Sequence, residues 1–326
     1  MIPVQRRLAR ALRAGGPEVI EVSLEDLPSP GAGEALVRVE AVGLNHAETL
    51  IRTGKYTVRL PFPYAVGGEG SGTVVATGPE ATLPVGTRVC WGAVLGSCAT
   101  LLIAPASMLV PLPDGLTFET GASVAVASLT AGGLARVWPL KGRSAVVWGA
   151  AGAVGRMLVA LLSGQGTDVI GIASGARVEA VRAAGAKHAI DRASENIPDV
   201  VRAHTNGRGA DAVFDPIGAS TLETSLQLLA PRGCLINYGE LSGAALTINL
   251  HQLFAESIFV TKYNGMRWVE GFHEFAELIR RGLTLAENCP AVVSEVAGRW
   301  RLDQVAEAYR LLESGAGGKV LVLPNA

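Results

Sequence analysis

The chain lacks an excess of either charge. Its 326 residues include 28 lysines and arginines against 29 aspartates and glutamates, a formal net charge of −1 at pH 7. A chain so balanced creates no field that would attract nucleic acid, an anionic membrane or an acidic partner. We therefore expect a small-molecule substrate, with no nucleic acid and no membrane as partner.

Cysteine is scarce, and its spacing excludes the common metal and redox motifs. Neither a CxxC pair nor the spacing of a zinc finger occurs. The four cysteines are Cys90, Cys98, Cys234 and Cys289. We interpret them as reduced thiols of a cytoplasmic protein.

The chain also lacks an uninterrupted apolar run of membrane-spanning length. The best candidate, residues 144–164, carries Arg156 near its centre and is punctuated by glycines. We interpret it as a buried strand, a turn and a helix. The first seventeen residues hold four arginines and no acid, as in a mitochondrial presequence. Strand-like alternation follows directly, and we expect the N-terminus to be that of the mature protein.

Two kinds of pattern divide the chain. Residues 144–261 alternate short apolar runs with helical segments that end in glycine, which predicts a doubly wound parallel sheet. The expected strands are "SAVVW", "DVIGIA", "DAVFD" and "CLINYG", and the expected helical segments are "RMLVALLSGQG", "RVEAVRAAGA", "VVRAHTNGRGA" and "TLETSLQLLAPRG". Residues 12–112 are rich in Gly, Pro and Val and predict a partly antiparallel β domain. After the doubly wound region, two helical patterns and a final strand remain. We expect residues 1–125 and 267–326 to form one domain, and residues 126–266 to be inserted in it.

The segment "VVWGAAGAVGRM" has the context of a dinucleotide-binding loop. Three glycines follow an apolar strand and precede a helix, spaced as GxxGxxG. Such glycines allow a tight turn that brings backbone amides close to a pyrophosphate. The residues expected to contact the cofactor are Gly149, Ala150, Gly152, Ala153, Val154 and Gly155.

The second strand of this array lacks a terminal carboxylate. A site for NAD usually places Asp or Glu there to bind the ribose hydroxyls. Here the strand ends in Ala173, Ser174 and Gly175, and Arg177 follows. Ser174 and Arg177 are suited to a 2′-phosphate, which favours NADPH. The other interpretation of Arg177 is a solvated residue at the start of a helix.

With these motifs in order, the chain resembles the zinc-free medium-chain dehydrogenase/reductases. The segments that carry the resemblance are "AVGLNHAETLIRTGKY", "GGEGSGTV", "GTRV", "SLTAGG" and "GKVLVLP", together with the glycine loop. The closest branch contains the zeta-crystallin-type quinone oxidoreductases and the enoyl-thioester reductases. The resemblance implies an α/β protein with a GroES-like β-rich catalytic domain, an inserted Rossmann domain and usually a homodimer.

The resemblance also bears on metals. Zinc-dependent relatives carry GHE where this chain has Gly67, Gly68 and Glu69, so a glycine takes the place of a metal ligand. The family's cluster of four structural cysteines has no counterpart here, and the five histidines are dispersed. We expect no metal.

The segment "GLNHAETLIRTGKY" supplies the expected catalytic groups. In the resembling enzymes it lines the cleft that faces the nicotinamide. Tyr56, a protonated phenol at neutral pH, is expected to hydrogen-bond and protonate an enolate. The Asn45 amide is expected to donate to the substrate carbonyl or to the nicotinamide ribose. A loop tyrosine and a turn asparagine are the alternatives. Glu48 and Arg52 are expected to pair across one helical turn.

Two other residues of this segment bear on the catalytic assignment. His46 has the pKa of an acid–base group, but the family motif leaves its position free, and we interpret it as incidental. Leu50 stands where many quinone reductases carry a second tyrosine, so the acceptor stays open between quinone, enone and enoyl thioester.

By resemblance, four further residues are expected to contact the cofactor, and each also fits a turn or cap. They are Thr130, Tyr238, Gly239 and Lys319. The expected function is NADPH-dependent, zinc-independent reduction of an activated C=C bond or a quinone, as in a quinone oxidoreductase or enoyl reductase. The alternative is a protein that binds NADPH without turnover and serves a structural or sensing role.

Overall fold

The structure is a computed structural model that describes residues 4–56, 58–243, 246–269, 271–315 and 317–326. The chain divides into two compact units. The first comprises Met1–Leu129, Glu270–Asn288 and Val293–Ala326, and the second comprises Thr130–Val269 and Cys289–Val292. We propose that these units are the two domains for which the sequence suggested boundaries after residues 125 and 266.

Strands dominate the first unit. One sheet has the order β2-β1-β4, and a larger one has the order β15-β16-β3-β5-β6-β8, with β7 paired to β3. The strands are β1 Val4–Ala11, β2 Ile20–Leu27, β3 Glu34–Gly43, β4 Tyr64–Ala65, β5 Glu69–Thr77, β6 Arg88–Gly92, β7 Leu101–Pro105, β8 Val110–Pro111, β15 Val296–Arg301 and β16 Lys319–Leu323. In β3, Val37 and Val39 are buried while Arg38 between them is exposed, as an alternating strand requires.

The helices of the first unit come from both ends of the chain. They are α1 His46–Arg52, α9 Gly271–Asn288 and α10 Val305–Glu313. A further helix, α2 Phe118–Leu134, begins in the first unit and ends in the second. Helix α10 packs against α1, β15 and β16. The last segment of the chain thereby completes the unit that the first segment begins.

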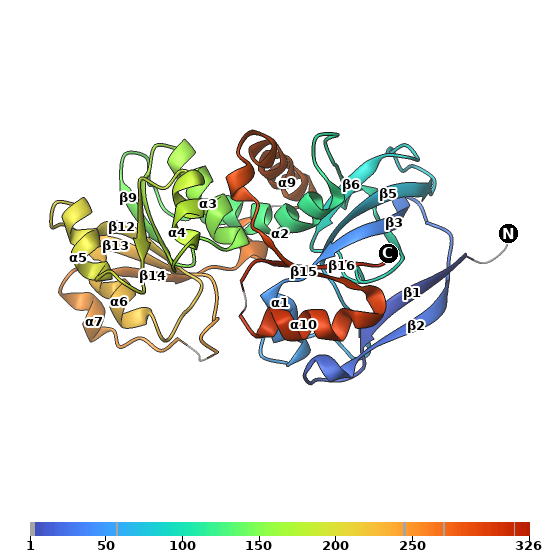
Figure 1. The fold of residues 1–326 in the computed structure, drawn as a ribbon, viewed down its shortest axis with the longest axis horizontal. Helices are drawn as coiled ribbons and strands as arrows, with labels where there is room; N and C mark the ends of the chain where they lie inside the picture. The colour runs from blue at the N-terminus through green and yellow to red at the C-terminus, as the bar shows by residue number, and fades with distance from the viewer. Residues whose placement is uncertain (1–3, 57, 244–245, 270, 316) are drawn as a thin grey trace. The chain divides into compact units, whose positions relative to one another are not determined.

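The second unit is built on a six-stranded parallel sheet of order β11-β10-β9-β12-β13-β14, which Figure 1 shows with its helices. The strands are β9 Ser144–Val147, β10 Asp168–Ala173, β11 His188–Asp191, β12 Ala210–Asp215, β13 Leu229–Asn237 and β14 Phe259–Lys262. The helices are α3 Ala153–Gly164, α4 Arg177–Ala183, α5 Ile197–His204, α6 Leu222–Gln227, α7 His251–Phe254 and α8 Gly265–Trp268. The strand order reverses between β9 and β12, as in a doubly wound fold.

The expected fold class is confirmed. The four apolar runs expected as strands correspond to β9, β10, β12 and β13, and the expected helical segments overlap α3 to α6. Helices α3 and α5 each begin three residues before the expected segment. A larger difference is at residues 229–233, which were expected in a helix, whereas β13 begins at Leu229. The residues that follow Gln227, "LLA", are all apolar, so periodicity alone does not separate the end of a helix from the start of a buried strand.

Two strands of the parallel sheet were not expected. They are β11 and β14, each only four residues long. Both lie at the edges of the sheet, and such short segments show too little alternation to be recognised. Across the described residues, no helix combines the length and the apolar character needed to cross a bilayer.

Candidate functional site

The loop after β9 has the geometry of a phosphate-binding turn. Gly149 adopts a φ of 61°, in the left-handed region that glycine enters without steric cost. A Cβ atom on Gly155 would lie 2.3 Å from the carbonyl oxygen of Gly149 and 2.7 Å from the Cα atom of Ala150. The loop therefore closes against the first turn of α3 at a distance that only glycine at position 155 permits.

Helix α3 presents backbone donors at its start. Gly152 is the N-cap, and the Arg156 amide donates to its carbonyl oxygen at 2.9 Å. The amides of Ala153, Val154 and Gly155 precede this bond, so they have no acceptor within the helix. This end of α3 follows β9, where the strand order reverses and nucleotides bind in such sheets. Amides and helix dipole together fit a pyrophosphate.

The carboxyl end of β10 carries basic groups beside a serine. Arg192 Nε donates to the hydroxyl oxygen of Ser174 at 2.6 Å, and the Arg192 amide donates to the Ala173 carbonyl oxygen at 3.0 Å. Arg177 begins α4, and its amide lies 3.4 Å from the Ser174 carbonyl oxygen. The sequence indicated Ser174 and Arg177, but not Arg192, which arrives from the end of the unrecognised strand β11.

A carboxylate does lie near this site. Asp191 Oδ1 accepts from the amides of Ala193 at 3.0 Å and Gly175 at 3.1 Å. These two hydrogen bonds lower the pKa of Asp191 below its usual value. Its charge is thus held in a turn, while the end of β10 itself presents Ser174.

The other expected cofactor residues of this unit lie at strand and helix ends. The Tyr238 amide, directly after β13, donates to the Asp215 carbonyl oxygen at 3.0 Å. A Cβ atom on Gly239 would lie 2.3 Å from the Pro216 carbonyl oxygen, so glycine is required by this close approach. Thr130 lies within α2 and is the first residue of the unit. Both Tyr238 and Gly239 share the carboxyl edge of the sheet with the glycine loop.

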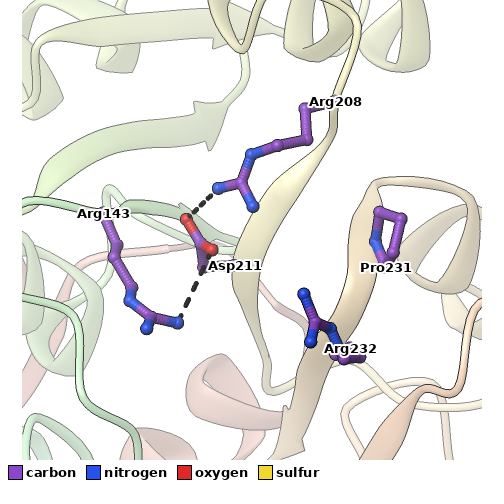
Figure 2. Close-up of a pocket in the computed structure, with 5 residues that line it drawn as sticks. All are labelled: Arg143, Arg208, Asp211, Pro231 and Arg232. Carbon is purple, nitrogen blue, oxygen red and sulfur yellow. Dashed lines mark hydrogen bonds and ion pairs between the residues drawn. The ribbon is translucent and has the colours of Figure 1, made fainter.

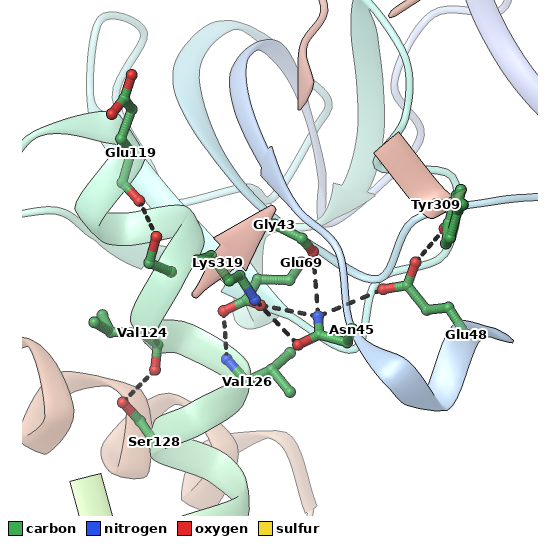
Figure 3. Close-up of polar contacts among 11 residues, drawn as sticks. Gly43, Asn45, Glu48, Glu69, Glu119, Val124, Val126, Ser128, Tyr309 and Lys319 are labelled. Atoms are coloured by element: carbon green, nitrogen blue, oxygen red, sulfur yellow. Dashed lines mark hydrogen bonds and ion pairs between the residues drawn. The ribbon is translucent and has the colours of Figure 1, made fainter. Parts of the chain in front are cut away.

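In the first unit, a buried polar network surrounds Asn45 (Figure 3). Lys319 Nζ donates to Glu69 Oε2 at 2.6 Å and to Asn45 Oδ1 at 3.0 Å. Asn45 Nδ2 faces Glu69 Oε2 at 2.9 Å, the Gly43 carbonyl oxygen at 3.2 Å and Glu48 Oε1 at 3.4 Å. The backbone amide of Val126 donates to Glu69 Oε1 at 2.7 Å. The amide donors of Asn45 are thus directed at acceptors of its own unit.

This network also gives Lys319 a local role. Its side chain is 5% exposed and that of Glu69 is fully buried. The ammonium group that the resemblance assigned to the cofactor is therefore the partner of a buried carboxylate. A charged pair so deeply buried is held in one geometry by its hydrogen bonds.

The expected pairing of Glu48 with Arg52 is wrong. Each instead reaches α10: the Tyr309 hydroxyl donates to Glu48 Oε2, and Arg52 pairs with Glu313. The Arg52 guanidinium also lies over the Tyr309 ring, 5.0 Å from its centroid. Because α10 packs on α1, partners distant in the sequence replace the local pair.

Tyr56 follows α1 in an exposed turn. Its amide donates to the Leu50 carbonyl oxygen at 3.0 Å, and its side chain is 38% exposed. The phenol is thus accessible to a small molecule. His46 begins α1 and is exposed, and Leu50 is half-buried.

A separate cavity of about 430 Å³ lies at the amino ends of strands of the parallel sheet, and Figure 2 draws the residues that line it. Its lining residues are Arg143, Arg208, Asp211, Pro231 and Arg232. A guanidinium nitrogen of Arg208 lies 2.7 Å from Asp211 Oδ2, and one of Arg143 lies 3.9 Å from Asp211 Oδ1. Arg143 precedes β9 and Arg208 precedes β12, so the cavity is at the amino ends of strands whose carboxyl ends face the loop.

In the chain as far as the structure describes it, no group of three or more histidine, cysteine, aspartate or glutamate side chains is placed to hold a metal ion. Gly68, at the position of the ligand in zinc-dependent relatives, is partly exposed.

Two family models match the chain. Residues 31–114 match the alcohol dehydrogenase GroES-like domain, and residues 153–283 match the zinc-binding dehydrogenase domain. The first match lies in the strand-rich unit and the second begins at α3, in the unit with the parallel sheet.

Curated relatives and a solved structure agree with these matches. The chain is 37% identical over 254 residues to a quinone oxidoreductase of Pseudomonas aeruginosa, covering 76% of this chain and 78% of that protein. It is 30% identical to a 2-haloacrylate reductase of a Burkholderia species, with coverage of 96% and 98%. The crystal structure of Escherichia coli quinone oxidoreductase complexed with NADPH matches with a TM-score of 0.86 and 27% identity, covering 98% of this chain and 100% of that one.

Proposed function

The chain belongs to the medium-chain dehydrogenase/reductase superfamily, and from this premise we propose that it is an NADPH-dependent reductase of an activated C=C bond or a quinone. The similar quinone oxidoreductases and the 2-haloacrylate reductase support an oxidoreductase. The first relative acts on a quinone and the second on a double bond activated by a carboxylate. The quinone and the activated double bond are both electron-poor acceptors, and the proposal includes both.

The phosphate loop carries the proposal. Gly149 holds a positive φ and Gly155 meets the loop backbone without room for a Cβ atom, which leaves the first amides of α3 open to a pyrophosphate. The E. coli structure with NADPH supports the choice of cofactor. We propose that Gly149 to Gly155 hold the pyrophosphate and that Thr130, Tyr238 and Gly239 contact the rest of the cofactor.

When bound, NADPH supplies a hydride. Adding hydride to the β-carbon of a conjugated carbonyl places negative charge on the carbonyl oxygen, which a nearby donor stabilises. The exposed phenol of Tyr56 is the proposed donor. Asn45, whose donors already face Glu69 and Gly43, is proposed to hold the shape of the site from within its network.

We propose that Ser174, Arg177 and Arg192 bind the 2′-phosphate. Replacing Arg192 by alanine is expected to weaken NADPH binding by about 10- to 100-fold, because a hydrogen bond to a charged group contributes about 1.5–3 kcal/mol. NADH has no 2′-phosphate, so its affinity should stay nearly unchanged. Titration of cofactor fluorescence with both nucleotides measures the two affinities.

The matched control for this variant is Arg182→Ala. Arg182 is an arginine of the adjacent helix α4 that pairs with Glu179 on the surface. It should leave both affinities as they are. Equal losses for NADPH and NADH in Arg192→Ala would contradict a phosphate contact.

Tyr56→Phe removes the proposed donor and little else. We expect kcat for an enone or quinone acceptor to fall about 100-fold or more, as for loss of one donor to a developing oxyanion. NADPH affinity should not change. Steady-state NADPH oxidation and a binding titration test the two expectations separately, and an unchanged kcat would remove Tyr56 from the mechanism.

A protein that binds NADPH tightly but oxidises it with none of these acceptors would instead be a structural or sensing member of the family.

We also propose that the protein is a cytoplasmic homodimer and that it works without zinc. Exposed apolar side chains in α7 and the edge strand β14 support an interface: Phe254 is 85% exposed and Phe259 is 54% exposed.

A further inference from the structure

The glycine at position 68 is not required by the fold. A Cβ atom on Gly67 would lie 2.6 Å from the Cys98 amide nitrogen, and one on Gly70 would lie 2.6 Å from the Trp91 ring. Gly68 differs from both: among the described residues, apart from its chain neighbours, the only heavy atom within 4 Å of its added Cβ is Glu48 Oε1, at 3.6 Å. Gly68 is also absent from the glycines with positive φ.

The missing side chain therefore leaves a space beside one carboxyl oxygen. Gly68 is partly exposed, so a small group can enter this space. Asn45 Nδ2 approaches Glu48 Oε1 only at 3.4 Å, and the Tyr309 hydroxyl donates to the other oxygen, Oε2 (Figure 3). Oε1 is thus the oxygen of Glu48 that remains available to a ligand.

Burial decides the protonation of Glu48. It raises the pKa of this carboxyl to about 7, while the Tyr309 hydroxyl, the Lys319 ammonium and the Asn45 amide act in the opposite direction. Glu69 adds to the increase. Two more titratable groups respond to the charge of Glu48, Tyr64 in β4 and the buried Cys98. Near neutral pH the carboxyl therefore exists in both forms, as a group that delivers and regains a proton must.

We propose that Glu48 is the proton donor of the reaction and delivers its proton from Oε1 to a substrate atom in the space over Gly68. This inference rests on the proposed reductase function and adds the source of the proton. Tyr56 remains the hydrogen-bond donor to the carbonyl oxygen, so the two roles fall to different residues.

The step balances with NADPH as the reductant and water as the final proton source. The hydride would leave NADPH with its bonding electron pair, which oxidises NADPH to NADP+, and it forms a C–H bond at the β-carbon. The π electron pair of the C=C bond moves to the α-carbon and the carbonyl oxygen. The O–H bond of Glu48 then breaks, its electron pair stays on the carboxylate, and the proton forms a C–H bond at the α-carbon. Water returns a proton to the carboxylate after the product leaves.

Three variants test the assignment in the NADPH-loaded protein with an enone acceptor. Glu48→Gln should lower kcat about 100-fold and abolish the decline of kcat above about pH 7, since general acids contribute about 10² to 10⁴. Tyr309→Phe should move that decline to higher pH, because it removes a donor that stabilises the carboxylate. Gly68→Ala should lower kcat about tenfold or more and leave the pH of the decline in place.

Gly68→Ala separates this role from a structural one. Its Cβ would be in ordinary contact with Oε1 at 3.6 Å, so the variant should fold as well as the unmodified protein and bind NADPH equally. Infrared difference spectra across pH supply a readout without turnover: the protonated carboxyl band that titrates near pH 7 should be missing in Glu48→Gln.

The outcomes are distinguishable. Normal turnover with an unchanged pH profile in Glu48→Gln would overturn the assignment of Glu48 alone. Full activity of Gly68→Ala would overturn the space over Gly68 as the place of proton transfer. Absence of turnover in the unmodified protein, with every acceptor, would overturn the proposed function and this inference together.

Discussion

Replacing Lys319 by methionine is expected to destabilise the first unit by about 3–5 kcal/mol. The substitution keeps the length of the side chain but removes the ammonium group that lies 2.6 Å from Glu69 Oε2. Glu69 is fully buried, so its carboxylate would retain only the hydrogen bonds from Asn45 and the Val126 amide. Urea denaturation at neutral pH measures the loss.

An exposed pair of the same length provides the control. Lys187 Nζ lies 2.6 Å from Asp168 Oδ2, but both side chains are more than half exposed. Lys187→Met should therefore cost less than about 1 kcal/mol, because water already solvates both charges. Equal losses in the two variants would contradict the claim that burial, rather than distance, gives the Lys319 pair its effect.

A double variant sharpens this prediction. Adding Glu69→Gln should restore much of the stability, because no buried charge then remains. The Gln carbonyl oxygen still accepts from the Val126 amide in that variant.

The sequence alone predicts the parts of the site that depend on short segments. A strand, three glycines and a helix follow one another within "VVWGAAGAVGRM", and their spacing specifies the loop that the structure contains. The same holds for the missing carboxylate after β10, because strand and helix start are adjacent in the chain.

The network of the first unit was beyond such reasoning because its members are distant in sequence. Glu48 and Tyr309 are 261 residues apart, and Lys319 and Glu69 are 250 apart. Local spacing paired Glu48 with Arg52, four residues on, but that pairing ignores the packing of α10 against α1. Arg192 was missed for the same reason: it reaches Ser174 from the next strand of the sheet, 18 residues later.

The network also changes which residues around α1 are expected to contact the substrate. From the sequence, Tyr56 was the first candidate for the polar catalytic group, and Asn45 was a second candidate for contact with the substrate. The structure commits the amide of Asn45 to Glu69, Gly43 and Lys319, and leaves the phenol of Tyr56 exposed. Glu48, first interpreted as a partner of Arg52 across one helical turn, is instead half-buried beside the space over Gly68. Long-range packing thus decides which side chains remain free for chemistry.

The second large effect is expected from Gly155→Ala, which should weaken NADPH binding by about 100-fold or more. The added Cβ atom would lie 2.3 Å from the Gly149 carbonyl oxygen and 2.7 Å from the Ala150 Cα atom, both of them backbone atoms that no rotamer change can move. The loop must therefore open, which spreads the amides that face the pyrophosphate. A 100-fold loss corresponds to about 2.7 kcal/mol, within the range that overpacking costs elsewhere. Fluorescence titration with NADPH measures it.

Gly164→Ala on the same helix is the matched control for this prediction. Among the described residues, apart from its chain neighbours and the backbone of its own helix, no heavy atom lies within 4 Å of a Cβ atom added at Gly164, and its backbone is helical. That variant should bind NADPH normally and gain about 0.5–1 kcal/mol, because alanine loses less conformational entropy than glycine in a helix. If Gly155→Ala bound NADPH as tightly as Gly164→Ala, the loop after β9 would not hold the pyrophosphate. The close approach of α3 to that loop would then serve only the packing of the helix on the sheet.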